Sequence, residues 1–195
     1  MFCLNGSYDG NLENKSHEQI TVGSNCFEGT IVTVEIVKIW RTSDFTDNKI
    51  PNEYCKNVTM LKDTDGKVIT EITIPSNITV VGERAFENCT AITSVTITEP
   101  DTTLSMYAFY YCKNLVTVNF PSNFSQTIIR YATFCQCSSL VNFDIPSSVV
   151  QLNDYAFAYS RKVVLDVSNI KYFGQRACRG TTIKSNLNDE ITNIG

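Results

Sequence analysis

The chain has 195 residues, of which 43% are hydrophobic and 18% charged, so it is a folded globular protein of one or two domains and not a disordered chain or a collagen-like fibre. Its 16 basic and 20 acidic residues give a net charge of −4, and we therefore expect no nucleic-acid partner bound through a basic surface. The single histidine, His17, rules out most His-based chemistry, including a His-rich metal site. We predict a non-enzymatic protein without cofactor or metal.

The N-terminal segment, residues 1–19, is polar and is interpreted as a leader or cap. It has neither the basic start nor the long apolar core of a signal peptide. The most apolar stretch, residues 31–40, is interrupted by polar side chains and is shorter than the roughly 20 residues that a membrane helix needs. We expect no direct insertion into a membrane.

Residues 20–195 are predicted to form one repeat domain, irregular over 20–68 and regular over 69–180. In the irregular part, residues 22–29 match 81–88, and residues 54–57 match 111–114, which predicts a hidden repeat there. The segments 41–49 and 62–68 are expected to be insertions. The second contains Asp63-Thr64-Asp65-Gly66, which is similar to the start of a calcium loop but lacks the later ligands, so a tight hairpin turn is the better interpretation.

Three sets of apolar positions recur together in the regular part. The first is the phenylalanine of an Ala-Phe-x-x-Cys motif, about 23 residues apart, which falls at Phe86, Phe109, Phe134, Phe157 and, in a degenerate copy, Cys178. The second lies five residues earlier, at Val81, Leu104, Ile129, Leu152 and Phe173. The third is an apolar-x-x-apolar-x-apolar pattern such as Ile92-x-x-Val95-x-Ile97. Ser160 departs from the cysteine of the motif, and residues 163–167 do not fit the third pattern.

A period near 23 residues is too short for a pair of helices and indicates one strand and one return segment per repeat. Thr, Val and Ile favour strands, and each strand is expected to lie beside its copy in the next repeat, in a parallel sheet. The Ala-Phe-x-x-Cys segment is predicted to form a short helical turn with its Phe inward. The fold class is therefore an α/β solenoid, rich in β-structure, of about seven repeats, in which the phenylalanine rings lie directly over one another.

Eight cysteines are few for a disulfide scaffold of this length. Four of them, Cys55, Cys89, Cys112 and Cys137, recur at one place in the repeat and are predicted to be free, buried thiols. Cys135 and Cys137 are one residue apart and have no second pair nearby, so no zinc site is expected.

At the C-terminus, residues 191–195 resemble 78–82, so we expect a truncated last repeat. An end-to-end dimer through that repeat is a further expectation.

The consensus Ile-x-x-Ile-x-Ile-Pro … Ile-Gly-x-x-Ala-Phe-x-x-Cys resembles the BspA-like leucine-rich repeats, the treponeme-type class. The resemblance covers residues 69–195 well and 20–61 loosely. It implies a right-handed leucine-rich-repeat solenoid with a parallel β-sheet on its concave face and short helical turns and loops on its convex face. It also implies a surface adhesin that binds host matrix proteins, host cells or other microbes, although similar repeats in some protists belong to intracellular regulatory scaffolds. The family has no catalytic residues to transfer to this chain.

The exposed strand positions of such a solenoid would tile the concave sheet, which we predict to be the binding surface for a protein or glycan. Their short hydroxyl and amide side chains make a flat, weakly acidic surface that can form hydrogen bonds without burying a charge. The candidate binding residues are Glu71, Thr73, Ser94, Thr96, Thr117, Asn119, Asn142 and Asp144.

Two other groups of residues have an alternative interpretation as plain structure. Tyrosines cluster around the predicted helical turn, at Tyr107, Tyr110, Tyr111, Tyr131, Tyr155 and Tyr159, where packing between neighbouring repeats is favoured over binding. Asn-x-Ser/Thr sequons, which matter only in a secreted eukaryotic protein, could be glycosylated at Asn57, Asn77, Asn88 and Asn123, although Asn is also a common turn residue.

Taken together, these patterns predict a non-enzymatic protein- or glycan-binding module, part of an adhesin or antigen at the cell surface or outside the cell. The alternative is a cytoplasmic scaffold that regulates a signalling enzyme such as a protein phosphatase, which the absent signal peptide and unpaired cysteines favour.

Overall fold

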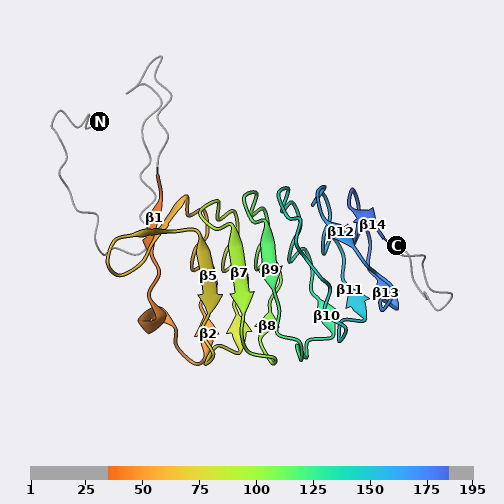
Figure 1. Cartoon of the computed structure of the whole chain (residues 1–195), viewed down its shortest axis with the longest axis horizontal. Helices are drawn as coiled ribbons and strands as arrows, with labels where there is room; N and C mark the ends of the chain where they lie inside the picture. The colour runs from red at the N-terminus through yellow and green to blue at the C-terminus, as the bar shows by residue number, and fades with distance from the viewer. Residues whose placement is uncertain (1–34, 185–195) are drawn as a thin grey trace, which may run out of the picture. The chain divides into compact units, whose positions relative to one another are not determined.

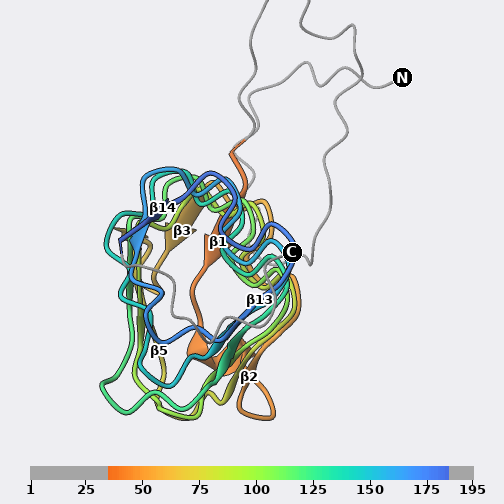
Figure 2. The same cartoon turned by 90° about the vertical axis from the view of Figure 1, so that its right-hand side faces the viewer.

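The computed structural model describes residues 35–184, which stack as successive coils within one compact unit (Figure 1). Each coil contributes a strand to a first ribbon, turns, contributes a shorter strand to a second ribbon, and returns through a tight arc. Figure 2 looks along the stack and shows the coils superposed, and buried apolar side chains fill the space that they enclose. The predictions for residues 1–34 and 191–195, including the leader, the first irregular match and the truncated repeat, lie outside the described residues.

The first ribbon, called the main ribbon, is parallel as predicted. Its centre consists of β5 (Glu71–Ile74), β7 (Ser94–Ile97) and β9 (Thr117–Asn119), paired in register. Alternate residues of these strands, such as Ile72 and Ile74, are buried against the core, which is the period of two expected for a half-buried strand. An isolated parallel bridge from Thr117 to Asn142 carries the ribbon into the next coil.

The main ribbon is interrupted after Asn142 and resumes as a separate pair, β12 (Val164–Leu165) with β14 (Thr182–Ile183). Leu140 is followed three residues later by buried Phe143, whereas Val163 is followed two residues later by buried Leu165. The missing residue explains why 163–167 do not fit the repeat pattern.

The second ribbon was not predicted. It consists of β2 (Lys49–Ile50), β6 (Val80–Val81) and β8 (Thr103–Leu104), followed by β10 (Ile128–Ile129), β11 (Gln151–Leu152) and β13 (Tyr172–Phe173). The apolar position five residues before each key Phe is its inward-facing residue. Two-residue strands show no alternation in the sequence, so the repeat predicted the buried position and not the strand.

The short helical turn predicted for the Ala-Phe-x-x-Cys segment is not present. Residues 82–89 and their copies instead form an arc of consecutive turns. The N–H of Ala85 bonds within the arc to Gly82, whereas the N–H of Phe86 bonds to the carbonyl of Ala108 in the next coil. Arg84 and Asn88 adopt left-handed φ angles of 56° and 52°, which a right-handed helix does not allow. Within residues 35–184 the only helical element is the 3₁₀ turn η1 (Thr42–Asp44).

The phenylalanine stack is confirmed. The ring centroids of Phe86 and Phe109 are 5.1 Å apart, those of Phe109 and Phe134 5.5 Å, and those of Phe134 and Phe157 5.4 Å, with interplanar angles of 4°, 1° and 15°. All four rings are fully buried. The repeat therefore specifies a continuous aromatic column through the core.

The predicted match of residues 54–57 to 111–114 is shifted by three positions in the structure. The N–H of Cys55 donates to the carbonyl of Ala85 in the next coil, just as the N–H of Phe86 donates to the carbonyl of Ala108. Cys55 therefore occupies the place that a phenylalanine of the column takes in the later coils. Since its side chain is small, the ring of Trp40 reaches the column and stacks on Phe86 at 6.1 Å. Phe45, from the predicted insertion 41–49, packs against the same indole at 5.2 Å.

The other predicted insertion forms a hairpin, in which β3 (Met60–Lys62) pairs with β1 (Val37–Ile39) in parallel and with β4 (Val68–Ile69) in antiparallel fashion. Asp63 accepts backbone hydrogen bonds from Asp65 and Lys67 through its Oδ1, and Gly66 adopts a φ of 81°. The carboxylate thus forms the turn itself, as the hairpin interpretation requires.

Cys55, Cys89, Cys112 and Cys137 are free and buried, as predicted, but Cys55 does not share the repeated cysteine position of the other three. The thiol of Cys112 donates to the carbonyl of Phe86 at 2.9 Å, and that of Cys137 donates to Phe109 at 3.1 Å. Ser160 donates the equivalent bond to Phe134 at 2.6 Å. The position therefore requires a small donor that joins neighbouring coils, which explains why serine replaces cysteine.

Candidate functional site

The exposed face of the main ribbon carries all eight candidate binding residues. Strand register aligns Glu71, Ser94 and Thr117 in one row and Thr73, Thr96 and Asn119 in a second. Asn142 continues the first row through its bridge to Thr117, and Asp144 is the next exposed position of that coil. Strand register and the bridge thus align these positions along one face, and their role in binding stays a prediction.

Hydrogen bonds between coils organise this face. The amide of Asn119 donates to the hydroxyl of Thr96 at 3.2 Å, and the amide of Asn142 donates to Thr117 at 3.1 Å. Because each amide bonds to the residue in line with it on the preceding coil, both side chains are held flat along the ribbon. Their exposed carboxamides retain further capacity to donate and accept hydrogen bonds.

The charge of this face is small, since Glu71 and Asp144 are its only ionisable candidates. A partner could therefore cover the centre of the ribbon without burying an unpaired charge, which is costly. The arrangement is suited to contact with a flat, polar partner surface through hydrogen bonds.

The tyrosines of the arc form a second row, for which the sequence pattern predicts packing between repeats. The rings of Tyr107 and Tyr131 are 5.1 Å apart, and those of Tyr131 and Tyr155 are 5.8 Å apart. The guanidinium of Arg84 lies 4.0 Å from the Tyr107 ring at one end, and Arg176 donates to the Tyr155 hydroxyl at 3.0 Å at the other. These half-buried rings pack between coils, as favoured.

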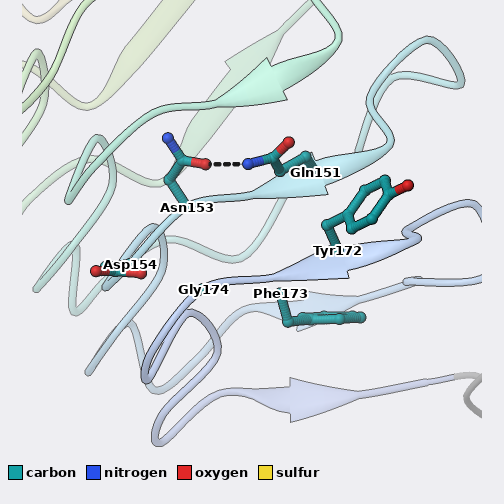
Figure 3. A pocket seen from close by; sticks show the side chains of 6 residues that line it. All are labelled: Gln151, Asn153, Asp154, Tyr172, Phe173 and Gly174. Atoms are coloured by element: carbon teal, nitrogen blue, oxygen red, sulfur yellow. Dashed lines mark hydrogen bonds between the residues drawn. The ribbon is translucent and has the colours of Figure 1, made fainter. Parts of the chain in front are cut away.

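A shallow pocket lies beside β11 and β13 and was not predicted (Figure 3). Gln151 donates to Asn153 at 2.7 Å across it, and Asp154 lies near Gly174, accepting the backbone N–H of Gln175 at 2.8 Å. A Cβ on Gly174 would come within 2.3 Å of Asp154, so the glycine is needed for the coils to approach. The pocket is therefore a consequence of packing between coils.

The four candidate glycosylation residues lie at coil turns. Asn77 and Asn123 are exposed and follow Pro75 and Pro121, whose carbonyls accept turn hydrogen bonds from Ile78 and Phe124. Asn57 is exposed, whereas Asn88 is half-buried and donates its amide to Asn57 at 2.9 Å. The turn interpretation is confirmed for Asn77 and Asn123, and glycosylation stays a prediction.

Among the described residues, no group of three or more His, Cys, Asp and Glu side chains is arranged to hold a metal ion. Burial raises the pKa of the Cys112 and Cys137 thiols well above the usual range, which is the opposite of what a cysteine nucleophile needs. The same part of the chain contains no helix that is long and apolar enough to cross a bilayer.

Comparison with known families identifies the repeat. A family model described as "BspA type Leucine rich repeat region" matches residues 65–185 in six copies, so the chain belongs to that family. Such repeats form solenoids that serve as binding modules. The predicted resemblance and the leucine-rich-repeat solenoid are confirmed, with almost no helix within residues 35–184. No curated protein matches the chain.

Among solved structures, a bacterial surface protein shows the same fold at low sequence identity. A leucine rich cell surface protein from Faecalibacterium prausnitzii is similar with a TM-score of 0.53 and 21% identity, over 65% of this chain and 38% of that one. A leucine rich repeat protein of T. pallidum is 20% identical with a TM-score of 0.48, over 71% of this chain and 58% of that one. The chain thus spans less than two thirds of the length of either protein.

Proposed function

We propose that the protein is a non-enzymatic binding module of a cell-surface adhesin or antigen, and that the exposed face of its main ribbon contacts a protein or glycan ligand. The single observation that supports this most is the pair of aligned, hydrogen-bonded rows that end in exposed carboxamides at Asn119 and Asn142. Such side chains are held before a partner arrives, so little side-chain entropy is lost on binding.

A location at the cell surface is part of the proposal. It draws support from the family and from the printed description of the F. prausnitzii protein as a cell surface protein. Six unpaired cysteines within residues 35–184 favour the alternative of a cytoplasmic scaffold for a signalling enzyme such as a phosphatase. Labelling unpermeabilised cells with an antibody to the full-length product distinguishes the two locations, and signal only after permeabilisation would support the scaffold.

The binding surface is tested by introducing long cationic side chains on it. The purified chain is measured by biolayer interferometry against immobilised fibronectin, laminin and collagen, and on a glycan array. Replacing Thr96, Asn119 and Asn142 together by Lys should abolish the binding that the wild type shows, because the added side chains cover the flat face.

A matched control carries Thr79→Lys, Thr127→Lys and Gln175→Lys, three exposed positions beside the second ribbon. This control should bind as the wild type does, and both variants should keep the wild-type circular dichroism spectrum. Equal loss in the two triple variants, or full binding by the main-ribbon variant, would place the ligand on another surface. A wild-type chain that binds none of the probes would contradict the adhesin proposal.

A further inference from the structure

Charge is distributed unevenly along the solenoid. Residues 105–181 contain seven basic and three acidic side chains, a net charge of +4, although the whole chain has a net charge of −4. In the first coils, ion pairs join Lys38 to Asp44, Lys56 to Glu53 and Glu87, and Arg84 to Glu83 and Glu87. The later coils thus carry more basic than acidic side chains.

Two of these basic residues border one hollow, where the arc turns back into the main ribbon. Lys113, Ser138 and Arg161 each follow the cysteine or serine that joins the coils, so they occupy the same position on three successive coils. With about 4.8 Å between neighbouring strands, the backbones of Lys113 and Arg161 lie about 10 Å apart. Because the serine between them is short, an open pocket of ≈ 340 Å³ remains, also lined by Gln136 and Tyr159.

The lining of this pocket has the chemistry of an anion site. Lys113, Arg161, Gln136, Ser138 and Tyr159 all carry hydrogen-bond donors, and no carboxylate lines the pocket. Neither Lys113 nor Arg161 forms an ion pair within the described part of the chain. The ammonium of Lys113 lies 4.2 Å from the centroid of the Tyr111 ring, a cation–π contact that positions it at the rim.

From this geometry we infer that the pocket between Lys113 and Arg161 is a second binding site, separate from the main-ribbon face, and that it takes the carboxylates of an acidic peptide segment of a partner protein. The arginine can hold a carboxylate through two parallel hydrogen bonds, and the lysine supplies a second point charge. Tyrosine and arginine are also the side chains that most often dominate protein interfaces, and both lie at this pocket. The pocket is open and shallow, which fits a segment lying across the coils better than an enclosed small molecule.

The test uses a fluorescein-labelled oligoglutamate peptide and an oligoglutamine peptide of the same length, with fluorescence anisotropy as the readout. The wild-type chain should bind oligoglutamate, bind it more weakly as salt rises, and not bind oligoglutamine. The double variant Lys113→Gln/Arg161→Gln should lose about tenfold in affinity, because both charge-assisted contacts are removed.

The matched control, Lys67→Gln/Lys184→Gln, removes the same charge from two exposed lysines outside the pocket and should stay within about twofold of the wild type. Equal losses in the two double variants would show attraction by net charge alone and would overturn the site. Absence of oligoglutamate binding would overturn it as well. Binding of heparin instead of oligoglutamate, lost in the Lys113/Arg161 variant, would overturn the acidic peptide in favour of a sulfated glycan.

Discussion

The phenylalanine column offers the sharpest test of the fold through Phe109, a central rung. Its ring is fully buried and stacked on both sides, at 5.1 Å from Phe86 and 5.5 Å from Phe134. Phe109→Ala removes the ring and leaves a cavity between rigid coils, so the free energy of unfolding should fall by about 3–5 kcal/mol. Phe109→Leu keeps most of the apolar volume and loses two ring pairs of about 0.5–1.5 kcal/mol each, so it should cost about 1–3 kcal/mol.

Urea unfolding measures both losses, with far-UV circular dichroism following all coils and the fluorescence of the single tryptophan, Trp40, following the end of the column. Tyr172→Ala, which removes an aromatic ring that is 46% exposed, serves as the control and should cost under about 1 kcal/mol. If Phe109→Ala costs no more than this control, or if the Leu and Ala variants are equally stable, the ring does not support its neighbours as described.

Two further predictions concern the hydroxyl and thiol groups. Ser160→Ala should lower the free energy of unfolding by about 1–3 kcal/mol, because the serine donates to the carbonyl of Phe134 and accepts from the N–H of Cys137. Ser160→Cys should cost less. Equal stability of the two variants in urea would contradict this role. Burial raises the pKa of Cys135 and Cys178 to about 11, so iodoacetamide should label them in the folded chain only slowly at neutral pH and faster as pH rises toward about 11. The thiols of the unfolded chain ionise at about pH 8.5, below those of the folded chain, so the free energy of unfolding should also fall as pH rises from about 8.5 to about 11. Rapid labelling of both cysteines at neutral pH would refute their burial.

The sequence predicted what repetition makes visible. The column from Phe86 to Phe157, the in-register strands and the exposed face of the main ribbon all follow from positions that recur with one period. What it did not predict depends on single residues. Trp40 reaches Phe86 only because Cys55 is small, and the repeat pattern does not show that Cys55 takes the place of a phenylalanine.

The arc illustrates a second limit of pattern reasoning. Ala-Phe-x-x-Cys has the spacing of a helical turn, yet alternate N–H groups of the arc bond to the next coil and cannot all serve a helix. Tyr107 and Tyr155 adopt left-handed φ angles of 59° and 58°, which their residue type does not suggest. The conformation is set by contacts between coils, information that a single repeat does not contain.

The two proposed surfaces differ in a way that makes them separable. The main-ribbon face recognises a ligand through neutral carboxamides and hydroxyls, so its binding should change little with salt. The pocket between Lys113 and Arg161 relies on charge, so its binding should weaken steeply as salt rises. A partner that binds more weakly as salt rises, and that still binds the triple Lys variant, occupies the pocket. A partner whose affinity changes little with salt, and that the triple Lys variant no longer binds, occupies the main-ribbon face. The column of phenylalanines fixes both surfaces to the same coils, so neither proposal requires a moving part.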